Sequence, residues 1–496
     1  MKRKIPVQNT DFISAGHNIQ TPFSVILSTE SSNQEVKCSR VLRNLPGKRL
    51  VCAAETGGQK VVAKFFTDPK KGKMHCRREE QGLSAFAKAG INTSELIFRA
   101  AIDPEGGRPV LVFRMFEDAT DFTVAWERAQ TDSRRMYLLK MLASTTALIH
   151  EAGLIHNDAH PGNFMVSGDL LYAIDGASVK VPNRGRALSP SRSVKNLAAV
   201  FSQFEPCFDH LFAEAFTAYT EKRKYPKSLS HANLLKKQIR IQRKKREKKY
   251  LKKIYRQSSA QVCSRGWDHF VVCKRNGHTR AMARLLEDPD RFISEGKLLK
   301  KGNSSTVAVL KVDGRSLVVK RYNIKSFGHA LSRCFRPSRA WRSWKNAHRL
   351  LMLGIATPQP VGLLEKRFGP LRSKAYFITE YSPGLDAYGW FHSSGGKKPD
   401  VYCVIRQFGH ILQIFYEHLI VHGDFKATNF ILTENNRIVV IDLDAMRCHT
   451  RMGWYFHRQF ARDCQRLMQN WSDIPEVSDL FYQEIEARGL LIPKNL

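Results

Sequence analysis

The sequence has no run of 18 apolar residues, so we expect no membrane-spanning helix. The basic N-terminus, MKRKIPVQNTDFISAG, has no apolar core after it and is not expected to act as a signal peptide. The 10 cysteines include no Cys-x-x-Cys pair and no Cys/His set with zinc-finger spacing. We therefore expect ordinary reduced thiols in a cytoplasmic protein, and any membrane association must be peripheral.

Acidic residues are also scarce. The chain has 45 Asp and Glu against 80 Lys and Arg, which gives a formal net charge of +35. This balance indicates a polyanionic partner, which could be an anionic membrane, a phosphorylated substrate or nucleic acid. The 496 residues, 43% of them hydrophobic, are enough for two or three globular domains.

Two β-hairpins with the same design occur in the two halves of the chain. RLVCAAETGGQKVVAKFF alternates apolar and polar residues around a Gly-Gly turn and ends near Lys64. STVAVLKVDGRSLVVKRY does the same around Asp313-Gly314 and ends near Lys320. A helical segment follows each hairpin and closes on Gly-Ile-x-Thr, at Gly90 and Gly354. These features predict an internal duplication.

Two polar loops repeat in the same way. They are IHNDAHPGNF, residues 155–164, and VHGDFKATNF, residues 421–430, and a short apolar strand with an Ile-Asp pair follows each. Each half therefore carries an aspartate, an asparagine five residues later and a further aspartate: Asp158, Asn163 and Asp175, then Asp424, Asn429 and Asp442. Asn196 and Asp463 each lie 21 residues beyond the last aspartate.

The segment between the halves, residues 236–256, has 12 Lys and Arg against one acid, Glu247, and contains neither Pro nor Gly. We predict a basic helix. It is either a solvated linker or a surface for an anionic membrane or phosphorylated glycolipid, and nucleic acid is the least favoured partner.

Phosphoryl transfer from ATP requires residues of these types. A strand lysine can bind the phosphates, a loop aspartate can accept the proton of the attacking hydroxyl, and an asparagine and a second aspartate can hold Mg²⁺. Each half supplies such a set. The spacing therefore predicts ATP-dependent phosphotransfer, with ATP and Mg²⁺ as cofactors.

HGDFKATNF…VVIDLDAM and HNDAHPGNF…YAIDGASV resemble the catalytic and metal-binding loops of the protein-kinase-like fold. Together with RAWRSWKNAHRLLMLGIATPQPVG and YFITEYSPG, the variants are similar to the bacterial lipopolysaccharide core (heptose/Kdo) kinases. The likeness covers roughly residues 290–470 well and about 40–200 more distantly.

This resemblance implies an α+β fold with two tandem bilobal protein-kinase-like domains joined by a basic helical linker. We predict an N-terminal extension over 1–35, a first domain over 36–232, the linker helix over 233–262 and a second domain over 263–496. The second domain is the main catalytic candidate and the first the weaker one.

The resemblance also assigns roles. In the second half, Lys320 would bind the α- and β-phosphates, Asp424 would be the catalytic base, and Asn429 and Asp442 would bind Mg²⁺. Three further residues would have supporting roles: Lys426 at the γ-phosphate, Gly302 in the loop over the phosphates and Glu380 at the hinge near adenine. The first half would use Lys64 paired with Glu79, and Asp158, Asn163, Asp175 and His160.

Each half departs from the family pattern at one supporting residue. Ser343 stands where a helix glutamate should pair with Lys320, so this lysine either lacks its usual partner or takes another, such as Glu295. Asn196 stands where an aspartate usually braces the catalytic loop, as Asp463 would in the second half. We expect His156 and His422 to be structural, and Asp444 not to bind metal.

The favoured function is an ATP-dependent kinase of a Gram-negative bacterium that phosphorylates a sugar hydroxyl of the lipopolysaccharide inner core, with heptose implied by the resemblance. The basic residues 236–256 would hold it on the anionic cytoplasmic face of the inner membrane. An atypical protein kinase is one alternative, although no Ala-Pro-Glu segment follows Asp442. A non-catalytic pseudokinase scaffold is the other, and the departures at Ser343 and Asn196 favour it.

Overall fold

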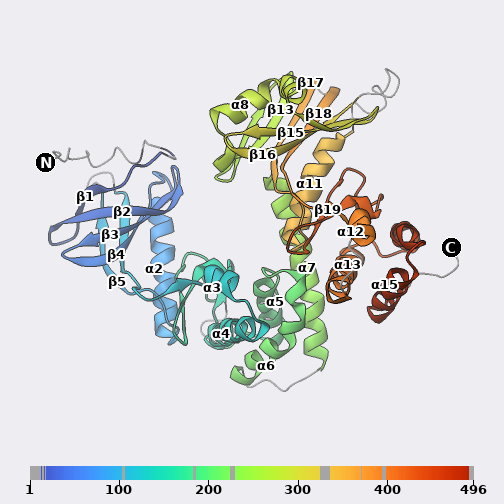
Figure 1. Ribbon diagram of the computed structural model, residues 1–496. Helices are drawn as coiled ribbons and strands as arrows, with labels where there is room; N and C mark the ends of the chain where they lie inside the picture. Colours follow the sequence, from blue (N-terminus) through green and yellow to red (C-terminus); the bar gives the residue numbers. More distant parts are fainter. Residues whose placement is uncertain are drawn as a thin grey trace. The chain divides into compact units, whose positions relative to one another are not determined.

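The computed structural model describes residues 13, 16, 18–102, 107–182, 186–223, 229–323, 336–369, 371–393 and 398–490. It is a mixed α+β structure, as predicted (Figure 1). The chain divides into two compact units, residues 1–204 with 208–244, and residues 205–207 with 245–496.

The first unit begins with a closed barrel, in the strand order β1-β2-β3-β4-β6-β5. Its strands are β1 Phe23–Ser28, β2 Asn33–Leu45, β3 Arg49–Thr56, β4 Gln59–Phe65, β5 Leu96–Ala101 and β6 Pro109–Arg114. The predicted hairpin joins β3 to β4, and its turn residues Gly57 and Gly58 have φ of 54° and 75°. Glycine adopts these left-handed values without steric cost. The range 1–35, predicted as an extension, contains β1 and the start of β2, while residues 1–12, 14, 15 and 17 lie outside the described residues.

Helix α2 Gly72–Lys88 lies beside this barrel (Figure 1). A second, largely helical part follows, and its core includes Phe164, Leu142 and Phe201. Its helices are α3 Phe122–Arg128, α4 Asp132–Glu151, α5 Pro190–Phe201 and α6 Phe212–Lys222, with the short 3₁₀ turns η1 Pro161–Asn163 and η2 Pro206–Leu211. Its short strands are β7 Thr120–Asp121, β8 Ile155–His156, β9 Phe164–Ser167, β10 Leu170–Ala173 and β11 Val179–Lys180.

The second unit begins with a seven-stranded sheet, in the order β12-β13-β17-β18-β16-β15-β14. Its strands are β12 Gln261–Arg265, β13 His269–Lys274, β14 Lys297–Lys301, β15 Ser305–Val312, β16 Arg315–Tyr322, β17 Pro360–Phe368 and β18 Leu371–Glu380. The turn between β15 and β16 is formed by Asp313 and Gly314, with φ of 49° and 73°, as the sequence predicted. Helix α11 Arg339–Met352 packs against this sheet, and η3 Arg275–Gly277, α8 Arg280–Glu287 and α9 Pro289–Glu295 connect β13 to β14.

The rest of the second unit is mostly helical, with α12 Ala387–Ser393, α13 Lys398–Glu417, α14 Trp454–Met468 and α15 Pro475–Ala487. Between these helices lie the short elements β19 Leu385–Asp386, β20 Ile420–Val421, η4 Ala427–Asn429, β21 Phe430–Leu432, β22 Ile438–Val440, β23 Arg447–Cys448 and η5 Gln469–Trp471. Trp471 is fully buried and stacks on Phe481 with ring centroids 5.5 Å apart. This aromatic packing helps to fix the helices around the polar loop of residues 421–430.

The basic segment 236–256 is helical, within α7 Leu229–Lys253. Its apolar side chains are used in packing, because Leu235 and Ile239 join the core of the first unit and Leu251 and Ile254 join the core of the second. Most of its lysines and arginines are exposed. β12 begins at Gln261, inside the range 233–262 predicted for the linker.

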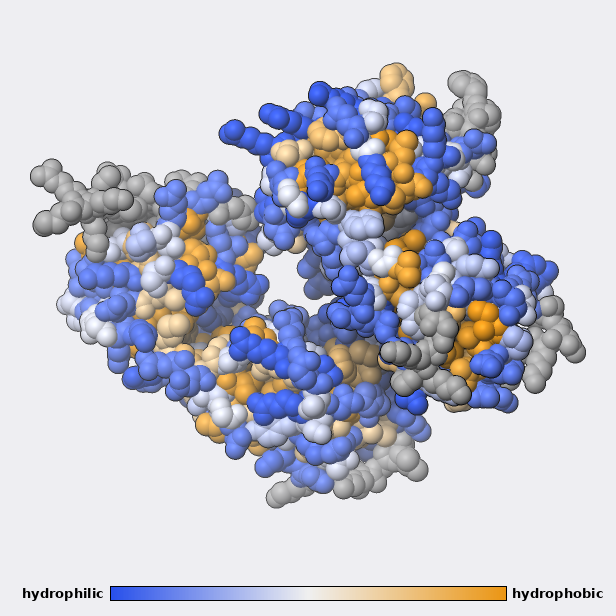
Figure 2. Space-filling model, viewed as in Figure 1, coloured by the Kyte–Doolittle hydropathy of each residue, from blue (hydrophilic) through white to orange (hydrophobic). Residues whose placement is uncertain are grey.

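Hydrophilic residues cover much of the surface seen in Figure 2, with hydrophobic residues showing between them. Among the described residues, no helix has both the length and the apolar character that a membrane span needs.

Candidate active site

Lys320, near the end of β16, contacts two aspartates. Its Nζ lies 2.6 Å from Oδ1 of Asp442 and 3.4 Å from Oδ2 of Asp444. Burial favours loss of the lysine proton, but the negative groups around it, including both aspartates, raise the pKa of Lys320 above its ordinary value. The lysine therefore stays charged at neutral pH and can bind an anion.

The alternative partner suggested for Lys320 is wrong. Glu295 lies on α9 and pairs with Arg291, at 2.9 Å, rather than with the lysine. Ser343 is buried and shares a 2.8 Å hydrogen bond with the hydroxyl of Tyr322. The missing helix glutamate is thus replaced by carboxylates from the loop that follows β22.

Asp424 and Asn429 are held together in the loop of residues 421–430. Nδ2 of Asn429 donates to the backbone carbonyl of Asp424, at 2.7 Å, and to its Oδ2, at 3.1 Å. Nζ of Lys426 lies 3.7 Å from the same Oδ2, and Arg466 lies 2.9 Å from Oδ1. Because Asn429 uses its amide NH₂ for this contact, its Oδ1 is left to act as a ligand or acceptor.

The same loop is braced from α14. Asp463 accepts hydrogen bonds from the backbone N–H groups of His422, at 2.6 Å, and Gly423, at 3.0 Å. Burial raises the pKa of Asp463 to about 6, although the two N–H groups act in the opposite direction. His422 is buried and donates from Nε2 to the carbonyl of Ile441, at 3.1 Å, and burial lowers its pKa. The histidine is therefore neutral and connects two loops, in agreement with the structural role expected for it.

Most of the predicted residues of the second half line one cavity of about 360 Å³: Lys320, Glu380, Lys426, Asn429 and Asp442. Apolar side chains such as Val307, Val318 and Ile431 form other parts of its wall, as a planar base requires. Gly302 is at the turn between β14 and β15, where its N–H donates to the carbonyl of Ser305, at 3.1 Å. Ser305 and Lys300, on either side of this turn, reach the cavity.

Asp442 has an unusual backbone conformation, with φ of 60°. A residue with a side chain rarely adopts this left-handed value, which costs of the order of 1–3 kcal/mol, and such residues cluster at functional sites. The strain is held by the surrounding hydrogen bonds, one of which runs from the N–H of Ile441 to the carbonyl of Asn429, at 2.9 Å. It allows the carboxylate to meet Lys320.

In the first unit the predicted ion pair between Lys64 and Glu79 is present. Nζ of Lys64 lies 2.5 Å from Oε1 of Glu79 and donates to the carbonyl of Ile174, at 2.9 Å. Glu79 has no exposed surface, and Arg49 lies 3.6 Å from its other oxygen. Helix α2 approaches the loop after Asp175 so closely that a Cβ on Gly82 would lie 1.9 Å from the carbonyl oxygen of Gly176.

The polar loop of the first unit repeats many contacts of the second. Nδ2 of Asn163 donates to the carbonyl of Asp158, at 2.7 Å, and Nε2 of His156 donates to the carbonyl of Asp175, at 3.0 Å. Asn196 also holds the loop, but by donating to the carbonyl of His156, at 3.2 Å. The side chain that braces the loop therefore donates a hydrogen bond to the backbone in the first unit, whereas in the second unit it accepts hydrogen bonds from the backbone. The exposed His160 accepts from the N–H of Gly162 through Nδ1, at 3.1 Å.

Comparison with known families gives a match within the second unit. Residues 283–477 match the model of the lipopolysaccharide kinase (Kdo/WaaP) family. Over this segment the chain is similar to that family. No curated protein matches the chain. The lipopolysaccharide kinase segment contains both the cavity residues and the loop that carries Asp424.

A family of kinases implies ATP and, with it, Mg²⁺. Among the described residues no group of three or more His, Cys, Asp or Glu side chains is arranged to hold a metal ion. The kinase segment instead brings two side chains with oxygen atoms, Asn429 and Asp442, to one cavity. Mg²⁺ bound to nucleotide phosphates commonly takes one or two protein oxygens and completes its shell with phosphates and water, so these residues fit the ion.

Several residues that contribute to the site in the kinase segment were not predicted from the sequence. Arg466 lies one helical turn beyond Asp463 on α14, a spacing that could have indicated a shared face. Arg339 binds Asp444, at 2.8 Å, and begins α11. The Gly-Ile-x-Thr motif also has a function, because Oγ1 of Thr357 donates to the carbonyl of Val440, at 2.7 Å. Thr93 makes the same bond to Ala173 in the first unit, at 2.6 Å.

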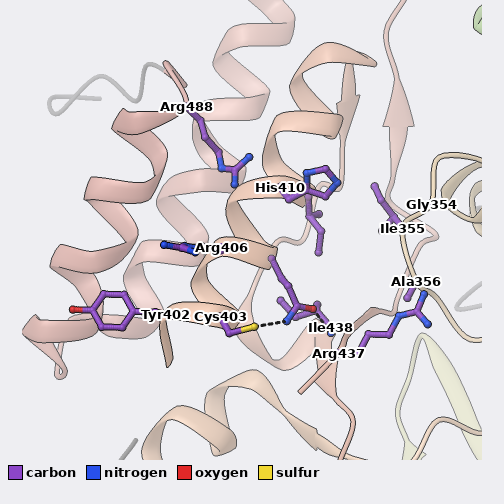
Figure 3. A pocket seen from close by; sticks show the side chains of 12 residues that line it. Gly354, Ile355, Ala356, Tyr402, Cys403, Arg406, His410, Arg437, Ile438 and Arg488 are labelled. Carbon is purple, nitrogen blue, oxygen red and sulfur yellow. Dashed lines mark hydrogen bonds between the residues drawn. The ribbon is translucent and has the colours of Figure 1, made fainter. Parts of the chain in front are cut away.

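A separate cavity of the second unit, of about 650 Å³, contains none of the predicted site residues (Figure 3). Tyr402, Arg406 and His410 reach it from α13, and Arg437 and Arg488 from other elements.

Proposed function

We propose that the second unit transfers the γ-phosphate of ATP to a sugar hydroxyl of the lipopolysaccharide inner core, with heptose as the first sugar to test. The observation that carries this proposal is the meeting of Lys320, Lys426, Asn429 and Asp442 at one cavity, beside Asp424, in a segment of the lipopolysaccharide kinase family. Each unit would be a bilobal kinase-like domain, and the two would form a tandem.

In this mechanism Lys320 exchanges Asp442 for the α- and β-phosphates of ATP, and Gly302 lies in the loop that covers them. Glu380, the last residue of β18, lines the cavity and would be the hinge residue beside adenine. Mg²⁺, held by Asn429 and Asp442, would neutralise charge on the phosphates during transfer. Lys426 offsets the charge that remains on the γ-phosphate.

Asp424 accepts the proton of the sugar hydroxyl as the new oxygen–phosphorus bond forms and the bond to ADP breaks. Its position is fixed by Asn429 on one side and by the loop brace from Asp463 on the other. General-base catalysis by a positioned side chain contributes roughly 10²–10⁴-fold to the rate.

The first unit would bind nucleotide through Lys64 and Glu79, with Asp158, Asn163, Asp175 and His160 in the positions of the catalytic loop. Its Asn196, in place of an aspartate, is the reason to assign it a supporting role. Exposed basic residues of α7 would attract the protein to the anionic cytoplasmic face of the inner membrane, at about 1 kcal/mol for each well-placed cation. Arg243 would not contribute, because it is buried and paired with Asp209, at 2.5 Å.

The test is ATP consumption by the purified protein with Mg²⁺, with and without dephosphorylated core oligosaccharide, in the wild type, Asp158→Ala and Asp424→Ala. We expect the sugar to stimulate turnover and Asp424→Ala to reduce it by roughly 10²–10⁴-fold, with a smaller effect of Asp158→Ala. Asp479→Ala, an exposed aspartate on α15, is the control. If no core sugar stimulates ATP turnover and neither substitution changes it, the kinase proposal is wrong, and a non-catalytic scaffold becomes the favoured function.

A further inference from the structure

A third cavity of the second unit, of about 880 Å³, is rich in arginine. Five arginines line it: Arg339, Arg342, Arg447, Arg462 and Arg466. They come from α11, β23 and α14, so parts of the chain more than 100 residues apart bring guanidinium groups to one place. The cavity of about 360 Å³ that Lys320 and Asp442 line shares no lining residue with this arginine-rich cavity.

The two acids of this cavity are already engaged. Asp463 accepts the backbone N–H groups of His422 and Gly423, and Asp444 contacts Lys320 and Arg339. Within the part of the chain that the structure describes, no carboxylate lies at ion-pair distance from the exposed Arg447 or Arg462. The cavity therefore carries an excess of positive charge, and such a concave surface concentrates anions.

The arginine cavity is adjacent to the proposed base. Gly423, the residue before Asp424, lines it, and Arg466 of the cavity lies 2.9 Å from Oδ1 of Asp424. Ser304, from the turn that follows Gly302, lines it too, so the cavity extends to the phosphate-covering loop. An acceptor bound here would lie beside Asp424.

We propose that the arginine cavity binds an anionic group, a phosphate or a carboxylate, of the acceptor sugar, and that this group draws Arg466 away from Asp424. Guanidinium groups bind both kinds of oxyanion with two parallel hydrogen bonds, which fixes orientation as well as position. Without acceptor, Arg466 occupies the oxygen that must take the hydroxyl proton. With acceptor, the arginine exchanges one anion for another and the carboxylate becomes available.

This inference rests on the proposed function, and it separates two roles. Arg447 and Arg462 would determine acceptor affinity. Arg466 would be a positioning residue that limits reaction of ATP with water when no acceptor is bound.

The first experiment uses the full-length protein with Arg447→Gln and Arg462→Gln combined. The matched control combines Arg406→Gln and Arg437→Gln, exposed arginines of the cavity in Figure 3. Acceptors are core oligosaccharide that carries phosphates but leaves the tested hydroxyl free, the same after full dephosphorylation, and the same after dephosphorylation and carboxyl reduction. KM for acceptor, kcat and the Kd for nucleotide are measured for each protein.

We expect the test variant to raise the KM of an anionic acceptor at least about tenfold, because charged hydrogen bonds are lost, while kcat and the nucleotide Kd change less than about twofold. The control should behave as wild type. The change in KM on dephosphorylation and the further change on carboxyl reduction show whether the cavity binds a phosphate or a carboxylate. A wild-type KM in the test variant, or a wild type that prefers the neutral acceptor, overturns the inference.

The second experiment concerns Arg466. Arg466→Gln should increase hydrolysis of ATP in the absence of acceptor by severalfold relative to phosphorylation of the sugar, and Arg466→Lys should restore the wild-type ratio. A structural role alone would lower both activities together, and that result contradicts the positioning role.

If the wild type phosphorylates no core sugar, the proposed function fails, and the cavity is then tested by calorimetric titration with the anionic and the carboxyl-reduced oligosaccharides. Binding of the anionic form that is lost in the test variant and kept in the control supports an anion site. Equal binding by all three proteins overturns it.

Discussion

Lys320 and Asp442 form an ion pair of 2.6 Å although they are 122 residues apart in the sequence. This contact connects the sheet of the second unit to the loop that would bind metal. In the family pattern the lysine partner is a helix glutamate, and here a carboxylate of the site itself takes that place. Nucleotide phosphates would have to replace Asp442 at the lysine, and this release would leave the aspartate available to Mg²⁺.

Lys320→Met should abolish most nucleotide binding, because it removes the cation that meets the phosphates and leaves Asp442 and Asp444 without it. We expect the Kd for ATP to rise by roughly 10²-fold or more, which corresponds to the loss of about 3 kcal/mol. Nucleotide titration measures this. Lys311→Met, at an exposed position of β15, should bind ATP as the wild type does.

Ser343→Ala tests whether Ser343 supports nucleotide binding by Lys320 or only packs against Tyr322. The variant loses the hydrogen bond between Ser343 and Tyr322, and the free energy of unfolding should fall by about 1–2 kcal/mol. The Kd for ATP should stay within twofold, since Lys320 is held by Asp442. Chemical denaturation and nucleotide titration give the two values. A large loss of ATP affinity at unchanged stability would contradict this assignment.

The pKa of Asp463 predicts a dependence of stability on pH. Folding raises this pKa from the model-compound value of 3.8 to about 6, so between these pH values the folded protein binds more protons than the unfolded chain. The contribution of Asp463 to stability is therefore fully present below about pH 4 and is lost as pH rises to about 6, by up to about 3 kcal/mol. The Asp463→Asn variant should lack this pH-dependent contribution to stability. Denaturation at several pH values gives the difference in free energy of unfolding between the wild type and the variant. We expect this difference to shrink as pH rises. A difference that does not depend on pH would show that Asp463 does not titrate in this range.

Glu79→Gln tests the ion pair of the first unit. Because Lys64 and Arg49 would keep their charges in a buried setting without the carboxylate, stability of the first unit should fall by about 3–5 kcal/mol. Thermal unfolding measures this loss. Glu80→Gln is the control, since Glu80 pairs with Arg99 at the surface and should matter little. Similar melting curves for the two variants would show that the buried pair adds nothing.

The sequence was sufficient for features that depend on local chemistry. The Gly57-Gly58 and Asp313-Gly314 turns require left-handed backbone, which these residues favour, so both hairpins could be placed. The spacing of Asp424 and Asn429 likewise predicted one loop, because a side-chain amide five residues on reaches back to the aspartate.

Features that depend on distant contacts could not be predicted in this way. The partners of Lys320 come from a loop more than 100 residues away, and nothing in the residues around Ser343 indicates that loop. The role of Arg466 depends on how α14 packs beside the loop of Asp424. β1 was missed because it pairs with β2 and β5, and residues 1–35 alone give no sign of these neighbours.

The bond from Thr357, five residues beyond the end of α11, to the carbonyl of Val440 attaches the segment after this helix to the strand that leads into Asp442. Asn346, on α11, adds two contacts, at 2.9 Å each, to the carbonyls of Leu443 and Met446. The helix and the aspartate must therefore move together. A partner molecule that shifted α11 would change the separation of Asp442 from Lys320. It would control phosphate transfer from a distance without entering the cavity of Lys320 or the arginine cavity.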